Sequence, residues 1–184
     1  MKSPTMLSVL ISTIFFLSCS NPVDFDQLNQ YSSEQVFSLP FVVFTIDEAN
    51  FDSTVEPVPS IFERSNFKIL DGTFMKESLI QLEFDFEIKN GINRAFKIEI
   101  IFRELDFNGI EGREVHLLEF NVDAKNQGFT EKVFITKADS PDILNFLRVE
   151  IKLTLEDDST PIDQADAGEL EFNSGITVHS KAKF

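Results

Sequence analysis

The chain has 184 residues and a formal net charge of −15 at pH 7, from 16 basic and 31 acidic side chains. A protein this acidic repels nucleic acids, so we expect no DNA or RNA partner. It contains 21 phenylalanines but one tyrosine and no tryptophan. Because phenylalanine packs cores and carries no polar group, this composition favours a scaffold over the Tyr- and Trp-rich surfaces that bind proteins or sugars.

The N-terminal stretch has the pattern of an export signal. Residues 1–18 contain one cation, Lys2, followed by a mainly apolar run of twelve residues from Met6 to Leu17, which carries no charge. Twelve residues are too few to span a bilayer as a helix, but they suit the central region of a secretory signal. We therefore predict that residues 1–18 are a signal peptide that the mature protein lacks.

The end of this run, Phe16-Leu17-Ser18-Cys19, resembles the lipobox of bacterial lipoproteins, in which a small residue precedes the cysteine that becomes lipidated. Cys19 is the only cysteine of the chain. The resemblance implies cleavage before Cys19, acylation of its thiol and amine with palmitate-like chains, and attachment to a membrane leaflet. The residues alone also allow an ordinary signal peptide, with Cys19 inside the mature chain.

The residues after Cys19 bear on the destination of the protein. Ser20 and Asn21 do not resemble the aspartate signal that keeps lipoproteins in the inner membrane, so we expect the protein in the outer membrane. The residues do not distinguish its periplasmic face from its external face. As a whole the chain resembles short, uncharacterised lipoproteins of Bacteroidota, in which a polar tether precedes a sandwich domain. A lipidated lone cysteine leaves no thiol for a disulfide, so we expect packing alone to hold the fold.

The chain divides into a tether and one domain. Residues 19–35 are predicted to be the lipidated cysteine and a flexible polar tether, and residues 36–184 the domain. Within the domain, eight or nine short alternating segments are separated by turn signals, which predicts an all-β antiparallel β-sandwich, immunoglobulin-like or jelly-roll-like. The run Ser140-Pro141-Asp142 offers an N-cap, a proline and an acid, and it predicts one short helix over 141–146.

The clearest strands are Gln81–Lys89 and Phe96–Ile100, in which every second residue is apolar. Because Asn90-Gly91 lies between them, we predict a β-hairpin. Side-chain parity rejects a two-residue loop and favours a three-residue loop with Gly91 in the left-handed conformation, which sets Phe84 opposite Phe96. The acids Glu83, Asp85 and Glu87 then form the wet face of a strand.

The sequence contains few signs of catalytic chemistry. We find no nucleophile, metal-protease or phosphate-loop motif, and His116 and His179 each lie within a strand pattern. A hydrolase would need one of these histidines to meet carboxylates in a cleft. We therefore expect no enzymatic activity and no cofactor.

An acid-rich loop, Glu156–Glu169, is the one candidate metal site. Calcium prefers several carboxylate oxygens from a bendable loop, and Asp157, Asp158, Asp163 and Asp166 are weak candidate ligands. Their spacing does not match an EF-hand, and a solvated loop is the alternative.

The sequence thus favours a membrane-anchored envelope lipoprotein with a non-enzymatic binding or assembly role, whose envelope protein or glycan partner is not specified. The alternatives are a carbohydrate- or calcium-binding module and a cell-envelope hydrolase. Exposed aromatic side chains on a sheet face would distinguish the carbohydrate-binding alternative.

Overall fold

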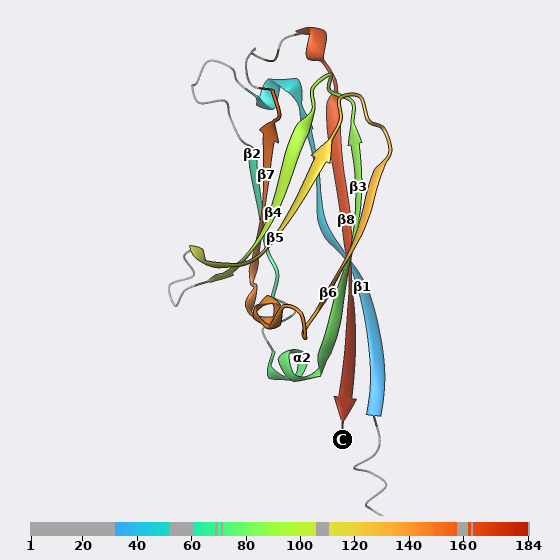
Figure 1. Ribbon diagram of the computed structural model, residues 1–184, viewed down its shortest axis with the longest axis vertical. Coiled ribbons are helices and arrows are strands. Elements are labelled where there is room, and N and C mark those ends of the chain that lie inside the picture. The colour runs from blue at the N-terminus through green and yellow to red at the C-terminus, as the bar shows by residue number, and fades with distance from the viewer. Residues whose placement is uncertain are drawn as a thin grey trace, which may run out of the picture. The chain divides into compact units, whose positions relative to one another are not determined.

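The computed structural model describes residues 32–51, 61–68, 70, 72–105, 111–157, 162 and 164–183, and Ser33–Ala182 form one compact unit. The strands described there form two four-stranded antiparallel sheets (Figure 1), which confirms the β-sandwich. The strands are β1 (Ser32–Asp47), β2 (Ile61–Asn66), β3 (Leu79–Asn90), β4 (Phe96–Leu105), β5 (Glu111–Val122), β6 (Phe129–Thr136), β7 (Arg148–Leu155) and β8 (Glu169–Lys183).

The strand order selects the jelly roll from the two sandwich types that the sequence allows. One sheet has the order β1-β8-β3-β6 and the other β2-β7-β4-β5. The first strand therefore lies beside the last, the second beside the seventh, the third beside the sixth and the fourth beside the fifth. This is the pairing of one long hairpin ribbon wrapped into two sheets, which defines a jelly roll.

The predicted hairpin between the third and fourth strands is wrong. β3 pairs with β6 and β8, whereas β4 pairs with β5 and β7, so the two strands belong to opposite sheets. Phe84 lies opposite Val133 and Ile176 rather than Phe96. The predicted inward faces are correct from Leu82 onward, because Phe84 and Phe96 are fully buried. Ile80, predicted on the same buried face, is 44% exposed, because the pairing with β8 shifts between Leu79 and Gln81.

Asn90 explains why the chain crosses between sheets instead of turning back. Its side chain is fully buried, and Nδ2 donates to the carbonyls of Arg94 at 2.7 Å and Asp123 at 2.9 Å. Its Oδ1 accepts from the backbone N–H of Ile92 at 3.0 Å. The side chain thereby satisfies the backbone of a wider crossing loop. The left-handed Gly91 is also wrong, because the positive φ angles of the described residues are at Lys125 and Gly168.

The crossing loop packs tightly against the start of β8. The N–H of Gly91 donates to the carbonyl of Glu169 at 2.7 Å, and Lys125 Nζ donates to the carbonyls of Gly91 and Ala167. A Cβ atom on Gly168 would lie only 2.1 Å from the carbonyl oxygen of Gly91. Glycine is therefore required at position 168, where two backbones meet.

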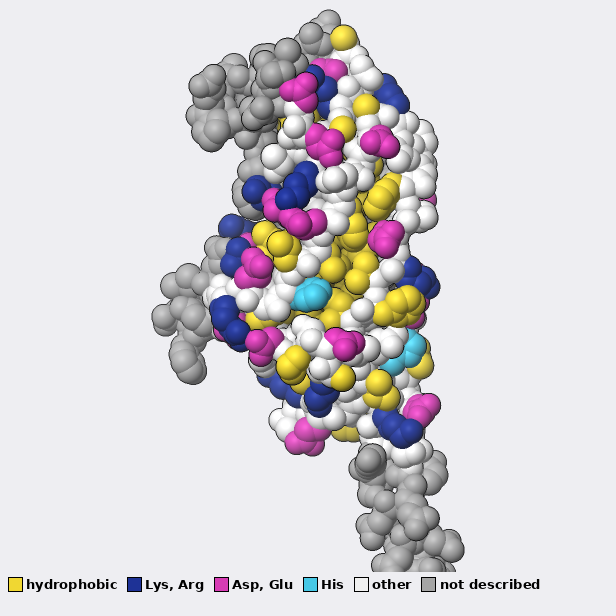
Figure 2. Space-filling model, viewed as in Figure 1, with side chains coloured by type: hydrophobic (Ala, Val, Ile, Leu, Met, Phe, Trp, Pro, Cys, Tyr) yellow, Lys and Arg dark blue, Asp and Glu magenta, His cyan; other side chains and the backbone are white. Residues whose placement is uncertain are grey.

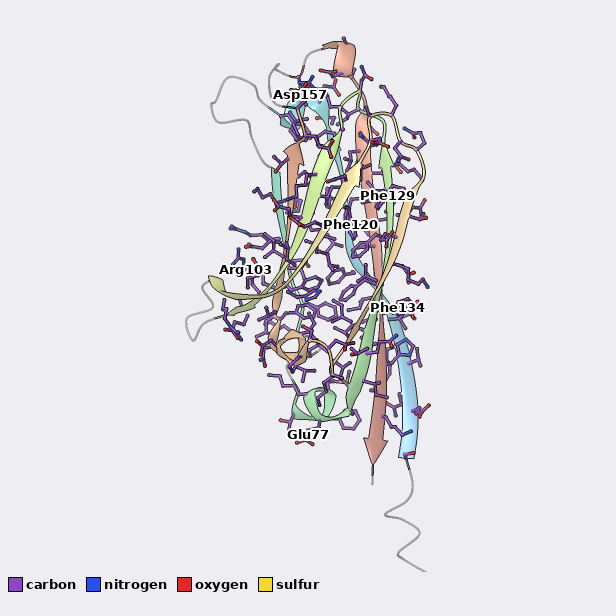
Figure 3. All side chains as sticks on the ribbon, viewed as in Figure 1. Glu77, Arg103, Phe120, Phe129, Phe134 and Asp157 are labelled. Carbon is purple, nitrogen blue, oxygen red and sulfur yellow. The ribbon has the colours of Figure 1, made fainter. Side chains whose placement is uncertain are left out.

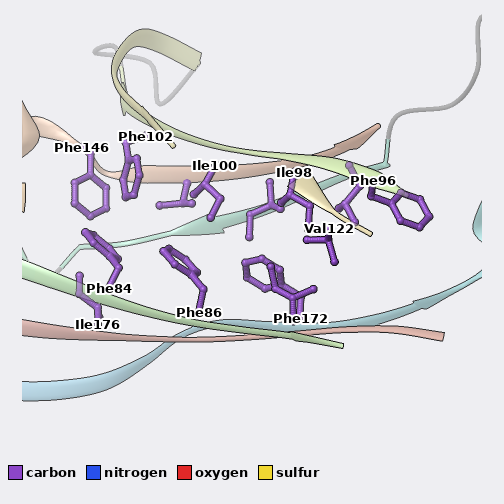
Figure 4. Packing of buried hydrophobic residues seen from close by; sticks show 14 of the residues in the cluster. Phe84, Phe86, Phe96, Ile98, Ile100, Phe102, Val122, Phe146, Phe172 and Ile176 are labelled. Carbon is purple, nitrogen blue, oxygen red and sulfur yellow. The ribbon is translucent and has the colours of Figure 1, made fainter. Parts of the chain in front are cut away.

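Phenylalanines form the centre of the core between the sheets (Figure 4). The ring of Phe84 on β3 lies 5.2 Å from that of Phe102 on β4, which in turn lies 5.1 Å from Phe146. On β8, Phe172 contacts Phe86 at 6.1 Å. These contacts account for the phenylalanine-rich composition, since edge-to-face and tilted ring pairs add to the burial of apolar area.

Short helical segments lie at both ends of the sandwich (Figure 1). The predicted short helix is confirmed as a 3-10 helix, η3 (Pro141–Asn145), with proline in its first turn. The structure also has an α-helix that the sequence did not predict, α2 (Thr73–Ser78), and two further 3-10 helices, η2 (Glu48–Asn50) and η4 (Gln164–Asp166). The first strand starts earlier than predicted, because β1 begins at Ser32, inside the stretch 19–35 assigned to the tether.

Candidate functional site

A groove of about 530 Å³ lies on the outer face of the β1-β8-β3-β6 sheet. All four strands of this sheet contribute to it. We call it the Gly175 groove, and its lining residues are Val43, Asp85, Phe86, Glu87, Thr130, Glu131, Lys132, Asn173, Ser174 and Gly175.

The groove exists because β8 has a glycine on its outer face. Gly175 lies opposite Asp85 of β3, and a Cβ atom there would have only the carbonyl oxygen of Leu39, at 3.7 Å, within contact distance. Next to it, Ser174 Oγ accepts from the N–H of Val42 and donates to the Val42 carbonyl. The Ser174 side chain thus holds β1 against β8. Because Gly175 has no side chain, the backbone of β8 is uncovered there and forms the floor of the groove.

The side chains around this floor can both donate and accept hydrogen bonds. Asp85 lies opposite Lys132 on β6, and Glu87 lies between Thr130 on β6 and Asn173 on β8. The carboxylates are acceptors, Lys132 is a donor, and the amide and hydroxyl groups serve as both. All of them stand on paired strands, so their backbone positions are fixed before any ligand arrives.

The same outer face carries an exposed aromatic ring. Phe134 lies two residues beyond Lys132 on β6, opposite Glu83, and is 55% exposed (Figure 3). Because strand residues alternate between faces, Phe134 and Lys132 project to the same side. A flat apolar surface therefore stands beside the hydrogen-bonding groups of the groove.

Several charged side chains on this face are already paired with one another. Lys132 Nζ bonds to Glu83 and lies 3.0 Å from Asp85 Oδ1. The hydrogen bond to Glu83, followed by that to Asp85, raises the pKa of Lys132, and the same bond from Lys132 lowers the pKa of Glu83. With Glu87 and Glu131 also in the lining, acids outnumber bases, so the groove disfavours anions.

The two histidines lie on different sheets and do not form one site. His179 of β8 faces outward, with Nε2 3.4 Å from Glu83 Oε2, and it is not part of the groove lining. His116 of β5 packs against Phe102 with the two rings tilted by 59° and their centroids 5.9 Å apart. His179 does line a second hollow of about 160 Å³, which Glu34 also lines. The hydrolase alternative, which requires a histidine to meet carboxylates in a cleft, therefore stays a prediction.

Burial of His116 predicts a pH dependence of stability. Desolvation lowers its pKa below the usual 6.5, opposed by the nearby charge of Glu114. The unfolded chain therefore binds this proton more readily than the folded protein, and stability is lost as the pH falls through 6.5 toward the lower folded value. We expect His116→Phe to reduce the drop in melting temperature between pH 7.5 and pH 5.5, measured by calorimetry. An equal drop in both proteins would contradict this role.

The candidate calcium ligands can be placed only in part. The Asp166 carboxylate lies 3.7 Å from Arg94 and is mostly buried, while Asp157 is exposed (Figure 3). Asp158 and Asp163 lie outside the described residues. Within the part of the chain that the structure describes, no group of three His, Cys, Asp or Glu side chains could hold a metal ion. Calcium binding by this loop stays a prediction.

A strip of hydrophobic side chains is visible on the side where the sandwich opens between β5 and β6 (Figure 2). Phe120 of β5 and Phe129 of β6 meet there at 5.7 Å, and Phe120 also contacts the buried ring of Phe86 at 5.1 Å. The strip is therefore continuous with the core, and its residues serve the packing of the two sheets.

The predicted anchor is outside the described part of the chain. Cys19 and the signal peptide precede the first described residue, Ser32. Among the described residues, no helix is long and apolar enough to cross a membrane.

Sequence reasoning did not identify the Gly175 groove. It assigned Asp85 and Glu87 to a wet strand face and said nothing of Lys132 or Asn173. The available signal was Gly175 itself, because a glycine inside an alternating strand marks a place where another group approaches the backbone.

Comparison with known proteins yields structural similarity alone. No protein-family profile and no curated protein matches the chain. A structure of infectious bursal disease virus, Gx strain, aligns with a TM-score of 0.44 and 8% identity over 79% of this chain and 32% of that one. A family 11 carbohydrate-binding module from Clostridium thermocellum, in complex with a mixed-linked β-1,3-1,4 tetrasaccharide, aligns with a TM-score of 0.43 and 11% sequence identity. The alignment covers 80% of this chain and 85% of the module.

A candidate secreted protein from Parabacteroides distasonis aligns with a TM-score of 0.42 and 20% identity over 65% of this chain and 37% of that one. The chain thus spans about a third of the length of the viral and Parabacteroides proteins. At these TM-scores the similarities carry no functional argument.

Proposed function

We propose that this chain is a lipid-anchored protein of the bacterial outer membrane whose jelly-roll domain binds a neutral, hydroxyl-rich ligand, of the oligosaccharide class, without transforming it. The observation that carries the binding role is the Gly175 groove on a rigid sheet face. Its volume of about 530 Å³ lies within the roughly 300–1,000 Å³ typical of small-ligand sites.

The chemistry of the lining supports the choice of ligand. A sugar hydroxyl both donates and accepts hydrogen bonds, so it can satisfy the carboxylates of Asp85 and Glu87 as well as the donors of Lys132 and Asn173. The excess of acids disfavours an anionic ligand. The exposed ring of Phe134 offers an apolar face to the C–H side of a sugar ring.

The residues before the domain support the anchor. The segment Phe16-Leu17-Ser18-Cys19 has the lipobox pattern, and a polar stretch separates Cys19 from β1. Several acyl chains on one residue hold a protein on a membrane far more firmly than a single chain does. The sheet that carries the groove would then be presented at the membrane surface.

A groove-filling substitution tests the binding site. A Cβ atom at position 175 would meet only the Leu39 carbonyl oxygen, at an ordinary contact distance of 3.7 Å, so we expect Gly175→Leu to fold with its side chain over the floor. Titration calorimetry of the mature chain against neutral cello-, xylo- and malto-oligosaccharides should show saturable binding of at least one of them. We expect Gly175→Leu to weaken that binding at least tenfold and Asn173→Ala to weaken it severalfold.

The matched control is Glu171→Ala. Glu171 lies on the same strand and face as Asn173, pairs with Lys89, and does not line the groove, so its loss should leave the affinity unchanged. Equal affinity of the wild type and Gly175→Leu would rule out the groove as the site, and no binding to any of the oligosaccharides would contradict the ligand class.

A further inference from the structure

The exposed apolar side chains of the sandwich gather at one end. Eight large apolar residues are exposed among the described residues, and most belong to the first half of β1, to α2 or to the start of β3. In Figure 1, α2 and the beginning of β1 lie at the same end of the sandwich. We call this group the proximal patch, and its members are Val36, Phe37, Leu39, Phe74 and Ile80.

Contacts join the elements that carry the proximal patch. Val36 and Ile80 line one hollow of about 160 Å³ on the outer sheet face. Ser180 of β8 lies opposite Leu79 of β3, and its hydroxyl donates to the carbonyl of Gln35 on β1. The starts of β1 and β3 and the end of β8 therefore form one continuous surface.

Part of the patch lies on the inner side of β1, where the second sheet does not cover it. Phe41 packs against Phe84 and therefore marks the inner face of β1. Phe37 and Leu39 lie four and two residues before it and so project to the same face. Phe37 and Leu39 are nevertheless 41% and 38% exposed. With Val36 exposed by 60% on the other face, this end of β1 shows apolar groups on both sides, which the packing of the domain does not explain.

Chain length determines which end of the domain can approach the anchor. Ser32, where β1 begins, is thirteen residues after Cys19, so the connecting chain reaches at most about 45 Å. The 15 residues of β8 span about 50 Å. The far end of the domain could therefore face the membrane only with the connecting chain almost fully extended, whereas the proximal patch lies at the end where that chain enters.

Lysines lie beside the acids around the proximal patch. Lys76, Lys137 and Lys181 lie at this end, where Lys137 Nζ donates to the Lys76 carbonyl and Lys181 pairs with Glu34. Hydrophobic side chains lie among lysines and acids at the lower end of the face in Figure 2. These lysines offset part of the repulsion expected between a chain of net charge −15 and an anionic headgroup layer.

We infer that the proximal patch docks on the phospholipid surface that the acyl chains of Cys19 enter, so that the sandwich stands on the membrane by this end. The inference rests on the lipid anchor of the proposed function. Val36, Phe74 and Ile80 then contact the boundary between headgroups and acyl chains, where amphipathic protein surfaces bind. The lipid supplies the cover that the exposed apolar residues lack.

Tryptophan fluorescence tests the docking, because the natural chain contains no tryptophan. The full mature protein carrying Phe74→Trp is reconstituted in phosphatidylcholine vesicles with and without brominated acyl chains, and intact mass spectrometry of the same sample reads the acylation of Cys19. The matched control is Leu117→Trp, an exposed apolar position on β5 outside the patch. We expect brominated lipid to quench Trp emission at position 74 at least threefold more strongly than at 117.

Adding Val36→Ser and Ile80→Ser to the Phe74→Trp protein should at least halve the quenching. An acylated sample with equal quenching at both positions would overturn the docking alone. Blue-shifted emission at position 74 without quenching would also overturn it, and would indicate a second protein copy on the patch. A sample without acyl chains would overturn the anchor and the docking with it.

Discussion

Replacing Gly168 by alanine is expected to destabilise the domain by at least about 3 kcal/mol, the upper part of the range for inserting atoms into a packed site. The new Cβ atom would lie 2.1 Å from the carbonyl oxygen and 2.4 Å from the carbonyl carbon of Gly91. Both are backbone atoms, so no side-chain rotation can relieve the overlap. The crossing loop between β3 and β4 would have to move away from β8.

Such a movement would break several contacts at once. The N–H of Gly91 donates to the Glu169 carbonyl, the N–H of Asn93 donates to the Asp166 carbonyl at 3.1 Å, and the N–H of Gly168 donates to Glu48 Oε2 at 3.2 Å. The first two bonds join the crossing loop to the start of β8 and to η4, and the third joins the residue before β8 to η2. Urea unfolding followed by circular dichroism would measure the loss as a lower midpoint.

The matched control is Gly128→Ala, at a glycine where a Cβ atom would have no neighbour within 4 Å. We expect this change to be neutral or to stabilise slightly, because alanine restricts the unfolded chain. If Gly168→Ala loses no more stability than Gly128→Ala, the close crossing of the two backbones is not needed for the fold.

Side-chain alternation predicted which faces of the strands are buried, but it could not predict which strands pair. Leu82, Phe84 and Ile98 point into the core as their period of two requires. The partner of a strand depends on distant residues, however. Asn90 redirects the chain through a bond to the carbonyl of Asp123, which is 33 residues away, and no local pattern contains that information.

Local turn chemistry was informative where the signal was complete. Ser140-Pro141-Asp142 has the residues of a helix start, and a 3-10 helix forms there with the proline in its first turn, although the Ser140 side chain makes no capping hydrogen bond. α2 begins after Gly72, which has no side chain to cap the helix, so the sequence contained no start signal for it.

The binding groove was hidden for the same reason as the strand pairing. Gly175 is visible as a glycine in a strand, but Lys132 and Val43 become its neighbours only through the order β1-β8-β3-β6. The candidate site therefore depends on the jelly-roll topology, which alternation alone left open.

Replacing Cys19 by alanine is expected to release the protein from the membrane fraction, with at least a tenfold loss of recovery. Each buried methylene of an acyl chain contributes about 0.8 kcal/mol to membrane binding, so removing the only thiol removes nearly all of the affinity. The proximal patch by itself offers a few apolar side chains, which bind far more weakly. Ser20→Ala is the matched control, because it changes the neighbouring residue and keeps the thiol.

Recovery is measured by blotting washed outer-membrane and soluble fractions from the native host. Equal recovery of Cys19→Ala and Ser20→Ala in membranes would show that something other than the acyl chains holds the protein there.

Intact mass spectrometry of the protein purified from membranes tests the lipid anchor most directly. The account predicts a chain that begins at Cys19 and carries the added mass of a diacylglyceryl group on its thiol. A chain that begins at another residue, or one with an unmodified Cys19, would contradict it.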